Sequence, residues 1–210
     1  MKKIFAKNLS IKKILQNFCF QIIQKILLKN FFFTNFSRWF FLGIVIAVII
    51  CFLDLLTKKL VFNLIDQYWQ NSQIISLLDI SNNDSNDNEL KILSFFSLVK
   101  VWNKGVSFGM FNQLKNSDII FSIIQGSIGL ILLFWLYQVK KPYLAVALGL
   151  VIGGAFGNTL DRFKNGAVAD FLDFHIATYH WPAFNLADSA IFIGIAILLC
   201  DEFIFNKKIK

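Results

Sequence analysis

Acidic residues are missing from the first 37 positions of this chain, whereas lysine recurs throughout them. The basic residues of this stretch and its border are Lys2, Lys3, Lys7, Lys12, Lys13, Lys25, Lys29 and Arg38. Arginine, which organellar presequences favour, is absent before Arg38, and no small-residue cleavage site of a secretory leader follows. The lysines are interleaved with apolar residues and lack a nucleic-acid-binding motif, so we expect no nucleic-acid partner. We interpret residues 1–37 as a basic amphipathic extension that lies on an anionic membrane surface.

Cysteine is also scarce, with three residues in a chain of 210. Cys19, Cys51 and Cys200 are too far apart in sequence to supply a disulfide framework or the ligand spacing of a metal site. We interpret them as small apolar packing residues. The sequence therefore predicts neither a metal nor another cofactor.

Apolar residues are abundant instead, because 56% of the chain is hydrophobic. They form runs long enough to cross a bilayer, which indicates a small multi-pass membrane protein. We predict four spans, at residues 39–62, 118–137, 143–160 and 182–205. The chain then divides into an N-terminal extension (1–37), a four-helix membrane domain (38–206) and a basic tail (207–210).

The positive charges predict how these spans are oriented. The basic head, the short loop with Lys140 and Lys141, and the tail from Lys207 to Lys210 all belong on the cytoplasmic side by the positive-inside rule. Both termini are then cytoplasmic, while residues 63–116 and 163–181 face outward. Within the first outward region we expect an Asn/Asp-rich solvated loop at residues 80–90.

A β-prone run follows that loop, at residues 91–111, and ends in a glycine-punctuated turn. It predicts a small sheet resting on the outer membrane surface, whereas residues 163–181 are expected to form an interfacial loop. The predicted fold class is an α-helical membrane protein with four transmembrane helices, a small extracytoplasmic β-sheet and an interfacial loop.

Small residues recur every four positions in the third span, at Ala145, Gly149, Gly153 and Gly157. A face of this kind lets two helices pack with their backbones close together. A direct role of these glycines at a functional site is the alternative interpretation.

Polar residues gather at the outward ends of the spans, between residues 151 and 189 above all. Charged groups at membrane depth are costly and usually mark function. Asp54 and Lys58 are four residues apart and share one helix face. Asn158, Asp161 and Arg162 likewise share a face at the end of the third span.

Four aspartates lie in this stretch, at Asp161, Asp170, Asp173 and Asp188. Carboxyls that lie close together cannot both ionise cheaply, so a pair of them would hold one shared proton. The ionised partner can draw a proton from water while the other protonates a leaving amine. We interpret Asp173 as a solvated loop charge. His175 and His180 are expected in a loop, without a Ser or Cys nucleophile nearby.

Five short motifs together resemble the signal peptidase II family, the lipoprotein signal peptidases. They are Asp54-Leu-Leu-Thr57-Lys58, Asn103-Lys-Gly105-Val-Ser-Phe108-Gly109, Gly153-Gly-Ala-Phe-Gly157-Asn158-Thr-Leu-Asp161-Arg162, Val168-Ala-Asp170-Phe171 and Pro182-Ala-Phe184-Asn185-Leu-Ala187-Asp188. The resemblance covers residues 39–205 in the family's order. The N-terminal extension and the Asn-rich loop depart from it without touching a motif.

The resemblance implies an intramembrane aspartyl endopeptidase of the bacterial cytoplasmic (inner) membrane, with its active site at the outer interface. It implies that Asp170 and Asp188 are the catalytic dyad. The residues expected to bind substrate or support the site are Asp54, Lys58, Asn103, Gly105, Asn158, Asp161, Arg162 and Asn185. The implied partners are membrane lipid and a prolipoprotein whose Cys carries diacylglycerol, cut on the N-terminal side of that Cys. We expect a monomer.

Three other functions remain open from the residues alone. A transporter or channel would line a pathway with intramembrane charges, although here these gather at one end of the spans. A metal-dependent hydrolase could hold Mg²⁺ with Asp161, Asp170 and Asp188. A structural assembly protein would need no carboxylates at the interface.

Overall fold

The computed structural model of this chain describes residues 38–77, 88–105 and 117–205. Four predicted features lie outside these ranges: the amphipathic extension at 1–37, residues 80–87 of the Asn-rich loop, the end of the second motif from Val106 to Gly109, and the basic tail.

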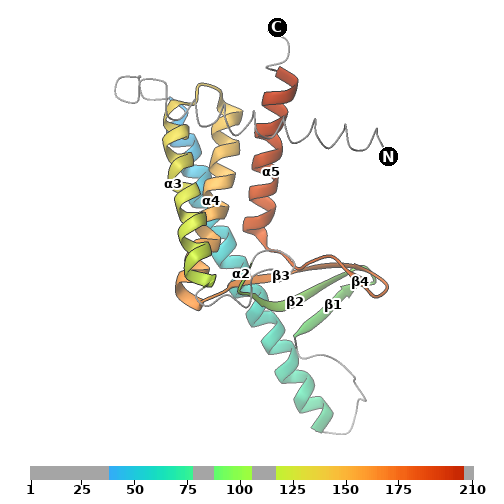
Figure 1. The fold of residues 1–210 in the computed structure, drawn as a ribbon. Helices are drawn as coiled ribbons and strands as arrows, with labels where there is room; N and C mark the ends of the chain where they lie inside the picture. Colours follow the sequence, from blue (N-terminus) through green and yellow to red (C-terminus); the bar gives the residue numbers. More distant parts are fainter. Residues whose placement is uncertain (1–37, 78–87, 106–116, 206–210) are drawn as a thin grey trace, which may run out of the picture.

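Four long helical segments form the body of the protein (Figure 1). They are α2 (Phe40–Leu77), α3 (Ser117–Gln138), α4 (Pro142–Asn165) and α5 (Leu186–Cys200), the last extended by the π-helical turn η2 (Asp201–Phe205). Within the described residues, α2, α3 and α4 are each long and apolar enough to cross a membrane. The four segments correspond to the four predicted spans.

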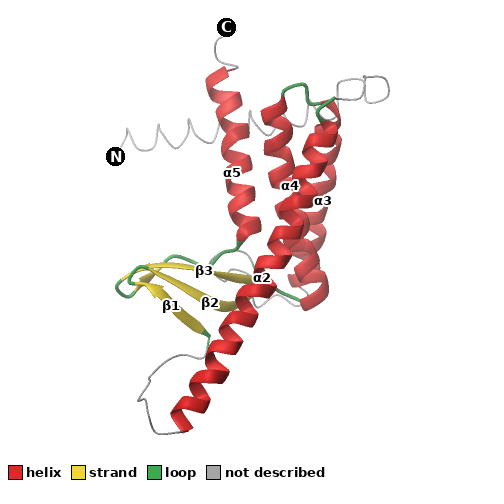
Figure 2. Cartoon of the chain, turned by 180° about the vertical axis from the view of Figure 1, so that it is seen from behind, coloured by secondary structure: helices red, strands yellow, loops and turns green. Residues whose placement is uncertain are grey.

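The first helix is much longer than its predicted span. We expected the helical run to end at Phe62, but α2 continues to Leu77. No Gly or Pro occurs between Asn63 and Leu77, and leaving a bilayer does not by itself end a helix. The far end of α2 therefore projects beyond the other helices, past the sheet (Figures 1 and 2).

Helix α4 lies at the centre of the bundle and packs closely against its neighbours through glycines. A Cβ built on Gly153 would lie 2.5 Å from the carbonyl oxygen of Ala47 on α2. On another face, a Cβ on Gly154 would lie 2.5 Å from the carbonyl oxygen of Ala187 on α5. Both separations are too short for a real side chain, so the predicted close packing is confirmed. Gly157 differs, because its added Cβ would meet the Asp54 carboxylate at 2.6 Å.

A four-stranded antiparallel sheet sits at one end of the helices, beside α2 (Figure 2). Its strands, in spatial order, are β1 (Glu89–Leu93), β2 (Phe96–Asn103), β3 (Val168–Ile176) and β4 (Tyr179–His180). The predicted sheet from residues 91–111 is confirmed by β1 and β2. The interfacial loop expected at 163–181 is wrong, because most of it forms β3 and β4.

The third strand connects the sheet to the start of α5. In the β2–β3 register, Val101 pairs with Asp170 and Asn103 pairs with Val168. An isolated bridge joins Leu172 to Phe184, just before α5. The register and the bridge bring Asp170 beside the first turn of α5, where Asp188 lies.

Candidate active site

Two carboxyl groups from different elements meet at the junction of the sheet and the helices. Asp170 lies on β3 and is 2% exposed. Asp188 occupies the third position of α5, where its carboxylate accepts a hydrogen bond from the backbone N–H of Asn185. Both residues line one cavity. The structure therefore places on one cavity the two aspartates that the family resemblance singled out.

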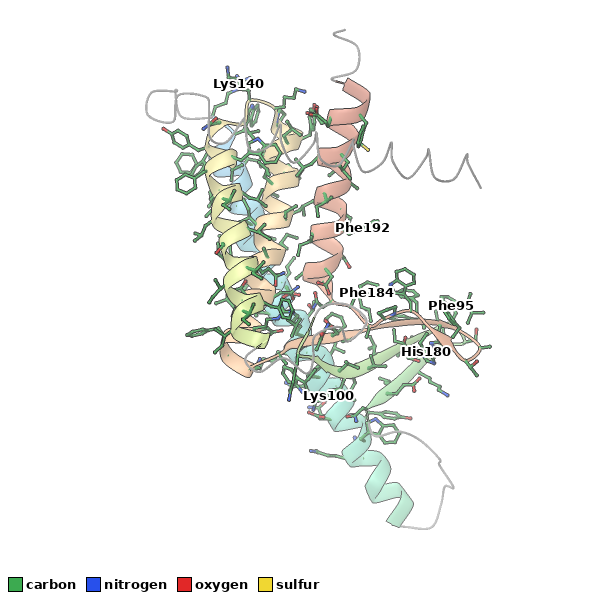
Figure 3. The ribbon with its side chains drawn as sticks, in the orientation of Figure 1. Phe95, Lys100, Lys140, His180, Phe184 and Phe192 are labelled. Carbon is green, nitrogen blue, oxygen red and sulfur yellow. The ribbon has the colours of Figure 1, made fainter. Side chains whose placement is uncertain are left out.

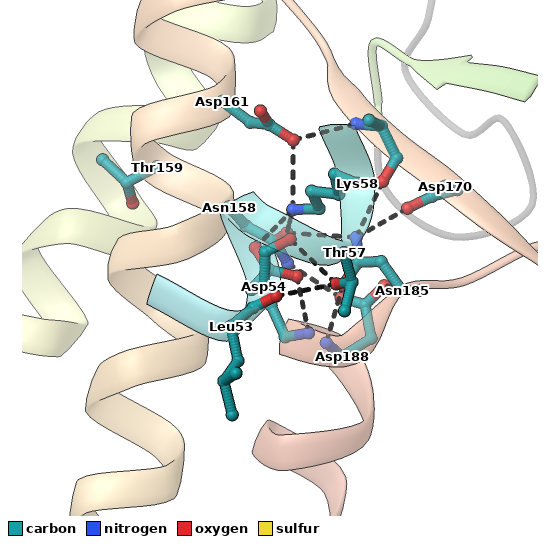
Figure 4. A network of polar contacts seen from close by, with 12 residues as sticks. Leu53, Asp54, Thr57, Lys58, Asn158, Thr159, Asp161, Asp170, Asn185 and Asp188 are labelled. Atoms are coloured by element: carbon teal, nitrogen blue, oxygen red, sulfur yellow. Dashed lines mark hydrogen bonds and ion pairs between the residues drawn. The ribbon is translucent and has the colours of Figure 1, made fainter. Parts of the chain in front are cut away.

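Asn185 connects these two aspartates (Figure 4). Its side-chain Nδ2 donates to Oδ1 of Asp170 at 2.7 Å. Its Oδ1 accepts from the backbone N–H of Asp188 at 2.9 Å, which caps α5. A short polar side chain in this position satisfies an otherwise unpaired N–H of the helix start. The cap of α5 is thus also a hydrogen-bonding partner of the dyad.

Lys58 and Asn158 form a second layer behind the dyad. The Lys58 ammonium, in a side chain 4% exposed, lies 2.6 Å from Asp54, 3.0 Å from Asp161 and 3.0 Å from Asn158 Oδ1. Asn158 in turn donates from Nδ2 to Asp188 Oδ1 at 2.8 Å. All three N–H groups of the ammonium therefore have an acceptor, which a buried charge requires.

The two carboxylates held by Lys58 also bind the backbone beside each dyad residue. Asp54 Oδ1 accepts from the N–H of Ala187 at 2.9 Å, next to Asp188. Asp161 Oδ2 accepts from the N–H of Ala169 at 3.0 Å, next to Asp170. The Lys58 ammonium therefore pairs with both carboxylates, that of Asp54 against the start of α5 and that of Asp161 beside β3. These two elements carry Asp188 and Asp170.

Asn103, Gly105 and Arg162 lie on the other side of Asp170. Asn103 Nδ2 donates to Asp170 Oδ2 at 3.0 Å, and its Oδ1 accepts from the N–H of Gly105. Arg162 donates to the carbonyl of Gly105 and, at 2.7 Å, to Gln125 on α3. We had not singled out Gln125. A long polar side chain in an apolar span was the available signal.

The sequence of this chain is similar to those of known proteins. The family model described as "Signal peptidase (SPase) II" matches residues 46–204 of the chain. The lipoprotein signal peptidase of Anaplasma marginale (strain Florida) is 43% identical over 118 residues, 56% of this chain and 69% of that protein. The one from Anaplasma phagocytophilum (strain HZ) is 38% identical over 128 residues, 61% of this chain and 82% of that protein.

The chain belongs to the signal peptidase II family.

Two solved structures of bacterial membrane enzymes are similar to this member of the signal peptidase II family. One superposes with a TM-score of 0.59 at 27% identity, over 85% of this chain and 98% of that chain. The other has a TM-score of 0.60 at 23% identity, over 82% and 99%, and shows the fold alone. The chain is therefore an integral membrane protein with the fold of a known membrane enzyme.

The cavity of this family member has a volume of about 800 Å³ and a mostly apolar wall. Its apolar lining comes from α3, from α5 and from residues 181–184. The residues on the two helices are Phe121, Ile124 and Ile128 of α3 and Ile191, Phe192 and Ile195 of α5. The dyad contributes the carboxyl groups of this wall. A largely apolar pocket with a few converging polar groups is typical of a ligand site.

Burial changes the acidity of Asp170 within this site. Loss of hydration is the larger cause and the charge of Asp188 the second, and together they raise the pKa of Asp170 to about 7. Hydrogen bonds from Asn103 and Asn185 oppose this rise without cancelling it. A carboxyl poised near neutral pH is suited to hold and release a proton in catalysis.

Our interpretation of Asp173 as a solvated loop charge is wrong. Asp173 lies on β3 and is 5% exposed, with Oδ2 2.7 Å from Nδ1 of His180. His175 and His180 likewise belong to strands rather than to a loop. The pairing of β3 with β2 and β4 buries Asp173, whereas the sequence predicted a loop for this segment.

Proposed function

We propose that this protein cleaves the signal peptide from prolipoproteins whose Cys already carries diacylglycerol, on the N-terminal side of that Cys. Asp170 and Asp188 are its catalytic dyad. The observation that carries the proposal is the convergence of these two carboxyls on one apolar cavity at the sheet end of the helices. The relatives named lipoprotein signal peptidase support the substrate class.

In the proposed mechanism the pair starts with one proton, held by Asp170. We assign the negative charge of the pair to Asp188, which sits at a helix N-terminus and accepts two hydrogen bonds, from Asn158 and from a backbone N–H. Asp188 removes a proton from water as the water oxygen attacks the scissile carbonyl carbon. Asp170 gives its proton to the developing oxyanion, which forms a neutral tetrahedral diol. The C–N bond then breaks as the leaving nitrogen takes the proton held by Asp188, and one hydroxyl of the diol returns its proton to Asp170 as the carboxylic acid product forms.

The remaining site residues divide into two groups by their contacts. The residues of the first group make polar contacts with one another, with the dyad and with the backbone beside it. They are Asp54, Lys58, Asp161 and Asn185. We assign them the role of holding the dyad in place. Asn103, Gly105, Asn158 and Arg162 line the cavity, and we assign them contacts with the substrate backbone or its ester groups.

The apolar part of the cavity fits the lipid of this substrate. Its aliphatic and aromatic wall on α3 and α5 would receive acyl chains that enter from the surrounding membrane lipid. The peptide would then reach the dyad where the helices meet the sheet. All of these residues lie within the proposed domain at 38–206, which we take to act as a monomer.

We place the enzyme in the bacterial cytoplasmic membrane with both termini in the cytoplasm and the sheet outside. Lys140 and Lys141, in the loop between α3 and α4, support this orientation. A cysteine introduced at the exposed position Lys91 on β1, in a background without the native cysteines, should react with an impermeant reagent from outside intact spheroplasts. Reaction of that thiol from the cytoplasmic side alone would refute the orientation.

The function itself is tested by incubating the purified protein with two precursors that differ only in the diacylglyceryl group. We expect release of the signal peptide from the lipidated precursor, with the cut before the modified Cys and no loss of rate in a chelator. Equal cleavage of both precursors would contradict the lipid requirement. Loss of turnover in the chelator that Mg²⁺ restores and Zn²⁺ does not would favour a metal-dependent hydrolase. Transport of a solute without cleavage would favour a channel.

A further inference from the structure

A second cluster of reactive side chains lies on the sheet, outside the dyad. It consists of Asp173 and His175 on β3 and His180 on β4, and the candidate ligand atoms of all three lie within 4.8 Å of one another. His175 and His180 face each other as a register pair, with ring centroids 4.8 Å apart. Figure 3 places His180 on the sheet, well away from Phe192 on α5. Nothing in the proposed cleavage uses these groups.

One atom of this cluster has no hydrogen-bond partner although it is buried. His175 Nδ1 lies 3.5 Å from Oδ2 of Asp173 without forming a hydrogen bond, in a side chain 10% exposed. The same Asp173 oxygen is 2.7 Å from Nδ1 of His180. A buried polar atom without a partner is costly and calls for an explanation.

We propose that Asp173, His175 and His180 bind one divalent transition-metal ion of the Zn²⁺ type. Two imidazole nitrogens and a carboxylate oxygen are ligands that zinc accepts, and a water molecule would complete a tetrahedral set. The ion would give His175 Nδ1 the partner that it lacks. Asp173, which shares its oxygen between the two histidines, would balance part of the charge.

The spacing of the cluster fits such an ion after a small movement. Ligands about 2.0–2.1 Å from a tetrahedral zinc are roughly 3.3 Å apart. The separation of 3.5 Å between His175 and Asp173 already has this size, whereas the 2.7 Å between His180 and Asp173 must widen. The His180 side chain is 50% exposed, so it has room to turn.

Binding would join the two strands on either side of a tight turn. Between them lies Ala177, whose φ of 53° is in the left-handed region that a non-glycine residue adopts at a cost. β4 leads directly into residues 181–184, which form part of the cavity wall. The ion would therefore hold the hairpin that carries this wall, without taking part in the chemistry at Asp170.

The proposal is tested with the full chain, purified through a tag that contains no histidine and stripped with a chelator. Zn²⁺ is titrated against a competing indicator dye, and Co²⁺ is then added to report the ligand geometry from its visible absorption. We expect one equivalent of Zn²⁺ at micromolar affinity or tighter, and a tetrahedral Co²⁺ spectrum. Absence of binding at micromolar Zn²⁺ would overturn the proposal.

Variants assign the binding to these residues. His180→Ala, at a half-exposed position, should fold and weaken Zn²⁺ binding at least about tenfold, as should Asp173→Asn. Two control variants should leave the Zn²⁺ affinity unchanged. Asp66→Asn removes a carboxylate that is distant in sequence from the cluster, and Cys200→Ser removes an exposed thiol. Unchanged affinity in His180→Ala, or a loss in Cys200→Ser instead, would show that the metal binds elsewhere and refute the site.

Discussion

The side chain of Asn185 donates a hydrogen bond to Asp170 at 2.7 Å while it accepts one from the backbone N–H of Asp188 at 2.9 Å. It is fully buried. The Asn185 side chain therefore connects Asp170 on β3 with Asp188 on α5. It fixes the orientation of the Asp170 carboxyl relative to the start of α5. The spacing of the dyad depends on this cap.

Asn185→Ala should lower turnover about 10- to 100-fold, because it frees Asp170 and uncaps α5. Stability should fall by about 1 kcal/mol from the lost cap, and further from the buried groups left without partners. Asn63→Ala, at an exposed position on α2, is the control. Comparable losses of activity in both variants would contradict the role of Asn185.

Asp170→Asn and Asp188→Asn should each reduce cleavage by about 10²- to 10⁴-fold or more, because each removes an ionisable group without changing its size. The double variant should cost little more than either single one, since residues that act as a unit are not additive. Single-turnover cleavage of a lipidated precursor measures this. Asp66→Asn is the control, because Asp66 is half exposed and pairs with Lys100. Near-normal cleavage by either dyad variant would end the proposal.

The cleavage rate should fall with a midpoint near pH 7 on the alkaline side. The pKa of Asp170 is raised to about 7, so above that pH both carboxyls are ionised and the shared proton is gone. The profile of kcat/KM against pH for the wild type reports this group. A profile that stays flat to pH 9 would assign the proton to another residue.

The same shift predicts how stability changes with pH. Because the folded-state pKa lies above the ordinary 3.8, the folded protein holds the proton more tightly between about pH 4 and pH 7. The contribution of this group to the free energy of unfolding is present below pH 4 and is lost as the pH rises through 7. Thermal unfolding of Asp170→Asn should lack this part of the pH dependence, which a parallel scan of the wild type would reveal.

Lys58→Met should destabilise the protein by about 3–5 kcal/mol, because it leaves the buried carboxylates of Asp54 and Asp161 without their cation. Lys100→Met offers a matched comparison, since Lys100 pairs with Asp66 at the same 2.6 Å but at an exposed position. Exposed pairs contribute about 0–1 kcal/mol. Unfolding in detergent, followed by temperature or denaturant, compares the two. Equal effects would show that burial of the Lys58 network does not matter.

Gly153→Ala should weaken the contact of α4 with α2, because the new methyl group would lie 2.5 Å from the backbone oxygen of Ala47. A backbone atom cannot turn aside as a side chain can, so the helices must separate. Gly126→Ala on α3 is the control, since its Cβ would meet Thr159 at an ordinary 3.5 Å. We expect a lower unfolding temperature for Gly153→Ala alone. A similar drop in both variants would attribute the effect to the loss of glycine itself.

Much of this protein could be predicted from local patterns. Apolar runs of bilayer length determined the four helical segments, and the four-residue spacing of small residues determined which face of α4 packs closely. Carboxylates are costly among apolar residues, which marked the stretch that contains Asp170 and Asp188, and the resemblance of its motifs to signal peptidase II named these two. Each of these signals is contained in a short stretch of the chain, which is why the sequence alone sufficed.

The tertiary structure decided what depends on residues far apart. The pairing of Asn185 with Asp170, and the bonds of Asp54 and Asp161 to the backbone beside the dyad, join elements that no local period relates. The prediction failed for Asp173, because its charge suggested solvent, whereas the pairing of β3 with β2 and β4 buries it beside two histidines. A charge at membrane depth is costly wherever it occurs, but which group offsets that cost is determined only when the strands and helices meet.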